Sequence, residues 1–202
     1  MIEWLNFFIL FFSTLLFSYF YTLSIQPVKR EENRGERAWK ECMMLRSLSI
    51  GFEFIKTINM VLWTWFPIQI LNWKIHSNYL IGIFLSFIIS LPSAFILLKG
   101  VKDAGFETIQ PSKETPMYRG IYKYIRHPQS GGEFPLFVAL AFAINSWFLV
   151  IVMAAHMIIY LPIMIYFEEK DLIRRYGDNY RDYQKRTGAI FPKFRKKRII
   201  KT

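Results

Sequence analysis

The sequence predicts an all-α membrane protein: a single domain over residues 1–202 with about five transmembrane helices and a C-terminal interfacial helical segment. Hydrophobic residues make up 53% of the chain and aromatic residues 18%, more than a soluble domain normally carries. These residues gather in long runs with few charges, and a run of about 20 apolar residues is long enough to cross a bilayer. Lysine and arginine gather between the runs, as in loops on the cytoplasmic side of membrane proteins.

The first apolar run covers residues 4–25 and contains no charged residue. At 1.5 Å per residue it spans about 30 Å of hydrocarbon. Glu3 precedes the run and basic residues follow it, the reverse of a signal peptide, so we expect a retained transmembrane helix. Pro27 should end this helix, and residues 28–41 should form a charged connection with a short surface helix.

The second expected span, residues 47–71, contains Glu53 and Lys56. Their i,i+3 spacing puts them on one helical face, where each can offset the other's desolvation cost. They are either a structural pair that faces the bundle or the polar wall of a substrate cavity. The third expected span is 78–98, with a kink at Pro92.

An apolar stretch at 134–167 is too long for one crossing and predicts a hairpin of two spans that turns at Asn145-Ser146-Trp147. His156 in the last span is either a functional residue or a hydrogen-bonded packing residue. After the span, tyrosines and aliphatic residues recur at helical spacing with a break at Gly177, which predicts a helical segment at the membrane surface.

The formal net charge of +11 is concentrated in the two middle connections and after Glu168. This bias predicts that the middle connections and the C-terminus are cytoplasmic and that the N-terminus lies outside. The expected partners of the charge are anionic lipid head groups rather than nucleic acid. Cys42 is the only cysteine, so we expect neither a disulfide nor a cysteine metal site.

Two polar blocks stand out at the predicted cytoplasmic face. The first runs from Met117 to Glu133 and contains GIYKYIRHP followed by Gly132-Glu133; the second contains EEKDLIRRYGDNYRDYQKRTG and then FPK. In this pattern the chain resembles the isoprenylcysteine carboxyl methyltransferase family and its relatives among phospholipid amine methyltransferases. The resemblance covers roughly residues 80–194 and is strongest over 117–133 and 166–193.

The resemblance implies a bundle of transmembrane helices that binds S-adenosylmethionine between the Arg-His-Pro and Glu-Glu regions. It implies these cofactor contacts: Tyr122, Arg126, His127, Pro128, Glu168, Glu169, Tyr180 and Tyr183. Ser130 is a departure, because many members carry a tyrosine two residues after the proline. Its absence alters the pocket near the methyl group and hence the acceptor.

The chemistry of methyl transfer assigns catalytic roles to Arg126, His127 and Glu133. A carboxylate acceptor is already ionised and needs a cation to hold it, which Arg126 can supply. An amine acceptor must first lose a proton, which makes His127 or Glu133 a general base. The sequence leaves both possibilities open.

We therefore expect S-adenosylmethionine-dependent methyl transfer to a lipophilic acceptor. A prenylated cysteine carboxylate is the first candidate; a lipid amine, or another small lipophilic thiol or acid, is the second. A sterol-type reductase that uses NADPH and a non-enzymatic membrane scaffold or transporter remain alternatives.

Overall fold

The computed structural model describes residues 1–111, 113 and 119–193. Within these residues the chain is helical and has no strand, apart from two isolated β-bridges, which confirms the all-α prediction. The helices are α1 (Ile2–Ser24), α2 (Pro27–Arg34), α3 (Arg37–Leu62), α4 (Tyr79–Ala104), α5 (Pro128–Ala143), α6 (Trp147–Tyr176) and α7 (Asp178–Arg186), with short 3-10 turns η1 (Gln69–Leu71), η2 (Gly105–Thr108) and η3 (Gly120–Lys123).

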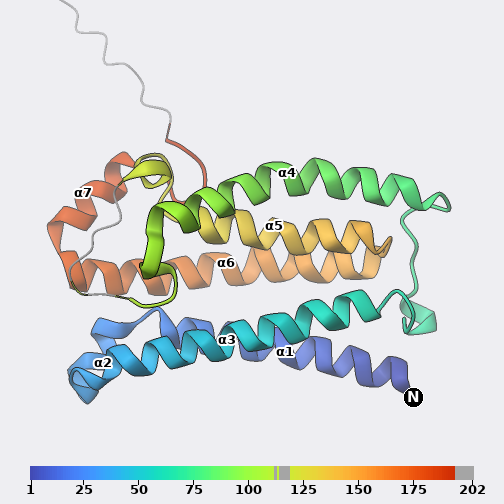
Figure 1. Ribbon diagram of the computed structural model, residues 1–202, viewed down its shortest axis with the longest axis horizontal. Coiled ribbons are helices and arrows are strands. Elements are labelled where there is room, and N and C mark those ends of the chain that lie inside the picture. The colour runs from blue at the N-terminus through green and yellow to red at the C-terminus, as the bar shows by residue number, and fades with distance from the viewer. Residues whose placement is uncertain (112, 114–118, 194–202) are drawn as a thin grey trace, which may run out of the picture.

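The five long helices run alongside one another, and the short helices α2 and α7 both lie at the same end of the bundle, on different sides of it (Figure 1). Helix α4 packs along α5, and α1 packs along α3. Helix α6 contacts both α5 and α1, so it joins the two pairs. Two clusters of buried apolar side chains fill the space between the helices, one around Met60 and Leu149 and the other around Phe134 and Met164.

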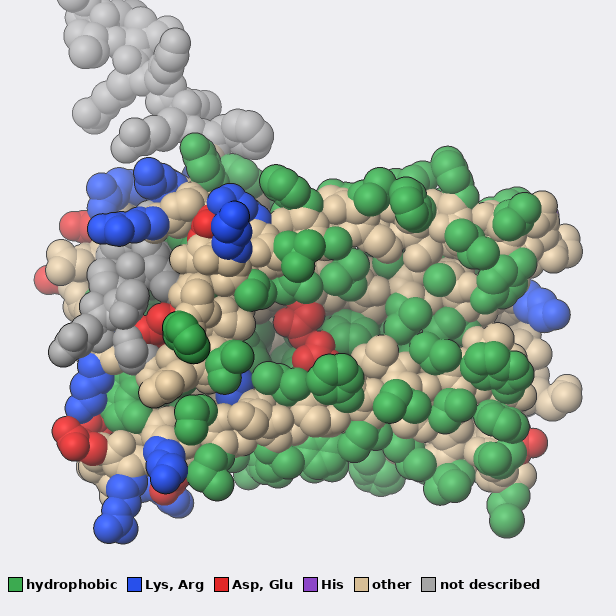
Figure 2. Space-filling view, viewed as in Figure 1, with side chains coloured by type: hydrophobic (Ala, Val, Ile, Leu, Met, Phe, Trp, Pro, Cys, Tyr) green, Lys and Arg blue, Asp and Glu red, His purple; other side chains and the backbone are tan. Residues whose placement is uncertain are grey.

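Hydrophobic side chains cover the outer surface of the long helices, whereas lysine and arginine gather mainly at the end that carries α2 and α7 (Figure 2). Within the described part of the chain, three helical stretches are long and apolar enough to cross a membrane: Ile2–Ser24, Tyr79–Thr108 and Trp147–Tyr176. Helix α3, with its internal charges, and the 16-residue α5 do not reach that standard. The expected number of five crossings therefore stays a prediction.

Proline and glycine set most of the helix ends. Helix α3 begins at Arg37 and ends at Leu62, so the expected span at 47–71 was wrong at both ends. Pro67 explains the early end, because it removes a backbone donor and disfavours helical geometry in the residue before it. Helix α4 runs past residue 98 to Ala104 and ends at Gly105, whose φ is +60°.

The hairpin and the C-terminal break were predicted correctly. Helix α5 ends at Ala143, Asn145 adopts a φ of +60°, and α6 starts at Trp147. The side chain of Asn145 fastens the turn, because its Nδ2 donates to the carbonyl of His76 at 2.9 Å. Helix α6 ends at Tyr176 and Gly177 has a φ of +58°, so the chain changes direction into α7.

The intramembrane histidine has a packing role. His156 Nε2 lies 2.9 Å from Ser18 Oγ, and its ring stacks on Tyr160 with centroids 5.2 Å apart. Tyr160 in turn donates to the Ser18 carbonyl at 2.8 Å. The histidine therefore joins α6 to α1 through polar contacts.

Candidate active site

The Arg-His-Pro segment is held in place by the chain that follows α7. The backbone N–H of Arg126 donates to the carbonyl of Gly188, and that of His127 donates to the carbonyl of Ala189, each at 2.9 Å. Pro128 then occupies the first turn of α5, where its missing N–H leaves no hydrogen bond unmade. The side chains of Arg126 and His127 are thus positioned by segments about 60 residues apart in the chain.

Glu168 and Glu169 on α6 meet these two side chains directly. Arg126 Nε lies 2.6 Å from Glu169 Oε1. His127 places Nδ1 3.0 Å from Glu168 Oε2 and Nε2 3.0 Å from Glu169 Oε1. We call Arg126, His127, Glu168 and Glu169 the paired cluster. The structure therefore brings together the two polar blocks that the sequence singled out.

Further hydrogen bonds hold Glu169 and Arg126 in place. Gln184 Nε2 donates to Glu169 Oε2 at 2.7 Å. Arg126 Nη1 donates to the carbonyls of Thr187 and Gln184. Only 9% of the Arg126 side chain and 3% of the His127 side chain is exposed, so these bonds are formed away from water. Buried charges are tolerated when they are paired in this way.

The two glutamates decide the charge of His127. Burial alone lowers the pKa of this imidazole, but the charge and hydrogen bond of Glu168, together with those of Glu169, outweigh it and raise the pKa to about 9. His127 is therefore an imidazolium at neutral pH. With both nitrogens protonated and bonded to carboxylates, it is unable to accept a proton from an acceptor.

Tyrosines from α7 and η3 cover the paired cluster. Tyr183 donates its hydroxyl to the Tyr122 carbonyl at 2.5 Å, and the ring of Tyr180 lies 5.7 Å from that of Tyr183. The Tyr122 hydroxyl receives a hydrogen bond from Gln129 Nε2 at 3.0 Å and donates to the Gly100 carbonyl at 3.3 Å. All three tyrosines are buried, so they form the wall that separates the cluster from solvent.

An inner cavity of about 60 Å³ lies against this group of residues. Its lining contains all the expected cofactor contacts except Glu169, which lies behind Arg126 and His127 and holds them. Glu133, expected to act here, is not part of the lining. Its carboxyl is instead hydrogen-bonded to Glu53 of α3.

The sequence did not indicate several residues of the cavity wall, which are Tyr21, Arg46, Glu107 and Arg175. Arg46 comes from α3, and its Nη1 donates to the carbonyls of Glu107 and Thr108 at 3.0 and 3.1 Å. Its Nε is buried and has no hydrogen-bond partner among the described residues. Arg46 is one of several basic residues before the second span, and no local motif distinguishes it from the others.

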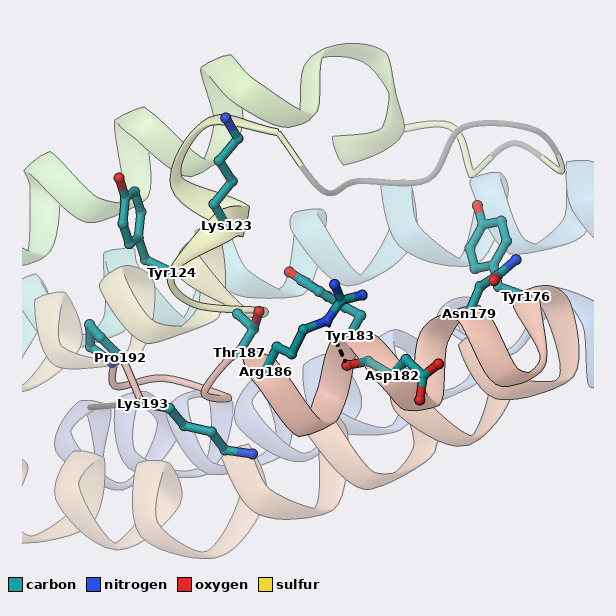
Figure 3. A pocket seen from close by; sticks show the side chains of 10 residues that line it. All are labelled: Lys123, Tyr124, Tyr176, Asn179, Asp182, Tyr183, Arg186, Thr187, Pro192 and Lys193. Atoms are coloured by element: carbon teal, nitrogen blue, oxygen red, sulfur yellow. Dashed lines mark hydrogen bonds between the residues drawn. The ribbon is translucent and has the colours of Figure 1, made fainter. Parts of the chain in front are cut away.

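A larger outer pocket of about 680 Å³ adjoins the inner cavity, because Tyr176 and Tyr183 line both. Figure 3 shows it between the segment that carries Lys123 and Tyr124 and helix α7. In the same view the Arg186 side chain is fixed by a hydrogen bond from its Nε to the Asp182 carbonyl. A volume of this size is within the range of small-molecule sites.

Comparison with known proteins gives a consistent set of relatives. The family described as phospholipid methyltransferase matches residues 79–179, half of the chain. Methanethiol S-methyltransferase of Pseudomonas deceptionensis is 31% identical over 157 residues, which are 66% of this chain and 54% of that protein. Methanethiol S-methyltransferase 1 of Bradyrhizobium diazoefficiens is 27% identical over 167 residues, 73% of this chain and 54% of the relative. Methanethiol S-methyltransferase of Crocosphaera subtropica is 29% identical over 174 residues, 76% of this chain and 63% of the relative.

The chain thus spans between half and two thirds of the length of these curated relatives. The matched residues 79–179 include α4, α5, α6 and all four members of the paired cluster. They exclude α1 and α3, which supply Tyr21 and Arg46 to the cavity wall. With its apolar helices and its matched segment, this chain is a membrane protein that belongs to the phospholipid methyltransferase family, in agreement with the resemblance found in its sequence.

Proposed function

We propose that this protein transfers a methyl group from S-adenosylmethionine to a small lipophilic thiol. The observation that carries the proposal is the convergence of Arg126-His127 and Glu168-Glu169 beside one cavity at the basic end of an apolar bundle. The relatives named as methanethiol S-methyltransferases support a thiol as the acceptor. When bound, S-adenosylmethionine supplies a methyl group on a cationic sulfur.

The residues around the two pockets match the polar groups of this donor. Its amino-acid carboxylate requires cationic hydrogen-bond donors, and Arg46 Nε is buried in the wall without a partner. Its ribose hydroxyls require an acceptor such as Glu168, which lines the cavity. Tyrosine faces attract a cationic sulfur, and Tyr176 and Tyr180 are in the wall. The outer pocket provides the volume for the nucleoside that the inner cavity lacks.

Arg126 argues against the carboxylate acceptor that was expected first. Its guanidinium is engaged by Glu169 and by two backbone carbonyls, so it has little capacity left to hold a second carboxylate. The inner cavity is therefore better suited to an acceptor without a negative charge of its own.

A prenylated cysteine remains a second candidate because an apolar groove leads away from the site. The groove, of about 650 Å³, begins beside Ile125 and Gly131 and continues along α4 and α6 past Leu161. An isoprenoid chain requires an apolar surface of this kind.

We further propose that α1, α3, α4, α5 and α6 all cross the membrane, with the N-terminus outside and the site and C-terminus cytoplasmic. The basic side chains at the α2 and α7 end support this orientation, with anionic lipid head groups as their partners (Figure 2). Single cysteines placed at Ser77 and at Asn179 should be labelled by impermeant reagents from opposite sides of a cell membrane.

The test of the function uses the purified chain in detergent. S-adenosylhomocysteine should raise its melting temperature, and tritium should pass from methyl-labelled S-adenosylmethionine to methanethiol. Glu168→Ala should abolish both effects. A sterol-type reductase would transfer no label, and a scaffold or transporter would show neither stabilisation nor transfer.

A further inference from the structure

A second group of charged residues, outside the cavity, is formed by the buried Lys56 and the half-buried Glu53 of α3 with the half-buried Glu133 of α5. We call these three residues the intramembrane trio. The sequence predicted the Glu53–Lys56 pair, and the structure adds Glu133, whose carboxyl group is hydrogen-bonded to Glu53. Ionisable residues at this depth in an apolar bundle are costly and are usually retained for function.

Lys56 is fully buried, and its ammonium has no hydrogen-bond partner among the described residues. Nζ lies 3.3 Å from the centre of the Phe137 ring and 4.6 Å from that of Phe17. Electrostatic attraction to Glu53 and Glu133 supplements these aromatic contacts. The charge of Lys56 is thus offset by two aromatic rings and by the two carboxyl groups, and its ammonium keeps its hydrogen-bond donors unused among the described residues.

Glu53 and Glu133 are half-buried and are hydrogen-bonded to each other. Two carboxyl groups form such a bond only when one of them carries a proton, so the pair is a site that takes up and releases protons. Figure 2 shows acidic side chains in a hollow of the apolar surface between α3 and α4. Because Glu53 and Glu133 are only half-buried, a small molecule that arrives from the lipid can reach the pair.

The pair also lies close to the inner cavity. Ser130 lines the cavity and Glu133 follows it by three residues, so the two share one face of α5 and are about 4.5 Å apart along the helix axis. Tyr21 lines the cavity as well and lies near both Glu168 and Glu133. Tyr160 and His156 of α6 are the further titratable neighbours, of Glu133 and Lys56 respectively.

A thiol needs a proton acceptor before it can be methylated, because the thiolate is the nucleophile. His127, the other candidate base in the sequence, is already protonated and bonded on both nitrogens. We propose that the intramembrane trio is the proton acceptor for the substrate thiol, an inference that rests on the proposed methyl transfer to a thiol.

In this step the S–H bond breaks and the proton passes to the ionised carboxyl of the Glu53–Glu133 pair. The sulfur keeps the electron pair and forms the new bond to the methyl carbon, while the bond between that carbon and the donor sulfur breaks and its electrons neutralise the sulfonium. Lys56 stabilises the carboxylate before the transfer. The carboxyl later releases the proton to water, so atoms and charge balance.

The test compares two acceptors that differ in acidity. Methanethiol is mostly protonated at neutral pH, whereas methaneselenol is a much stronger acid and is already ionised. Glu133→Gln should slow methylation of methanethiol by about 10²-fold or more, the usual contribution of a general base, and leave methylation of methaneselenol within about threefold of wild type. Glu53→Gln and Lys56→Met should show the same selectivity with smaller losses. Glu41→Gln, on the part of α3 bonded to Arg30 and Arg34, is the matched control and should change neither rate.

Retention of the stabilisation by S-adenosylhomocysteine verifies that each variant is folded. Equal losses for both acceptors, or no loss for either, would overturn the proton-acceptor role while leaving the proposed methyl transfer intact. If wild-type protein methylates methaneselenol but not methanethiol, the trio is no proton acceptor for a thiol. If wild-type protein methylates neither acceptor, the proposed function fails first.

Discussion

His127 of the paired cluster and Glu133 of the intramembrane trio are six residues apart, about 1.7 helical turns, yet the charges of the two groups are handled in opposite ways. In the paired cluster, Arg126 and His127 each contact a glutamate at 3.0 Å or less. In the trio, Lys56 has no hydrogen-bond partner among the described residues and rests on two aromatic rings.

This difference separates two uses of buried charge. A fully hydrogen-bonded ion cluster holds its members in one geometry, which suits the binding of a donor. A lysine without a hydrogen bond, beside carboxyl groups that share a proton, stabilises the fold less but is free to respond when a proton is exchanged. In our proposal, the paired cluster therefore positions the methyl donor, and the intramembrane trio exchanges a proton with the acceptor.

The largest effect is expected from removing Glu169, the carboxylate that Arg126 and His127 share. Glu169→Ala leaves Arg126 and His127 buried with one carboxylate between them, and loss of a buried ionic partner costs about 3–5 kcal/mol. We expect a large drop in the melting temperature in detergent and loss of the stabilisation by S-adenosylhomocysteine. Asp182→Ala removes an exposed ion pair from α7 and should change the melting temperature little. Equal effects of the two variants would show that the paired cluster is not a structural unit.

Arg46 tests whether a buried cation with one unused N–H donor in the cavity wall binds the methyl donor. Arg46→Gln removes the free Nε donor, and loss of one charged hydrogen bond weakens binding of S-adenosylhomocysteine by about tenfold or more. Titration calorimetry with S-adenosylhomocysteine and with its decarboxylated analogue measures the effect. Wild-type protein should prefer the ligand with the carboxylate, and the variant should lose that preference while binding the analogue as before. A uniform loss for both ligands would assign Arg46 to packing of α3 against η2.

The sequence predicted the paired cluster because topology alone brings its two halves together. An apolar hairpin at 134–167 returns the chain to the side it came from, so Arg126-His127 and Glu168-Glu169 had to lie at the same end. The turns could also be predicted from the sequence, because Asn145 and Gly177 adopt the positive φ angles that their residue types permit.

The rotation of α3 about its own axis could not be predicted from the sequence. In a membrane both the lipid-facing and the buried face of a helix are apolar, so periodicity does not tell which way Arg46 and Lys56 point. The sequence therefore paired Lys56 with Glu53 by spacing and assigned Glu133 to the Arg-His-Pro region. Packing of α3 against α5 adds Glu133 to the Glu53–Lys56 pair and places it away from the cavity lining.

Gly132 lies between His127 and Glu133 in the chain. It sets how closely α5 approaches α4. A Cβ at this position would lie 2.5 Å from the Ser93 carbonyl oxygen and 2.6 Å from Leu97 N, both backbone atoms. Gly132→Ala should therefore push the helices apart and destabilise the protein by about 1–3 kcal/mol, lowering its melting temperature. Gly51→Ala is the matched control in α3, where a Cβ meets nothing within 4 Å, and should be neutral or slightly stabilising. An unchanged melting temperature for Gly132→Ala would mean that α4 and α5 make room for a methyl group without loss of stability, so close contact at Gly132 is not required.

The last expected effect comes from titrating the paired cluster itself. The pKa of His127 is raised from its ordinary 6.5 to about 9, so the folded protein holds this proton more tightly than the unfolded chain does. Its contribution to stability is therefore complete below about pH 6.5 and is lost as the pH rises through about 9. The melting temperature of wild-type protein should fall by more than that of His127→Gln between about pH 7 and pH 10, because the variant has no imidazolium to lose. Parallel pH curves would mean that Glu168 and Glu169 do not hold the histidine in its charged form, and His127 would again become a candidate base in place of the intramembrane trio.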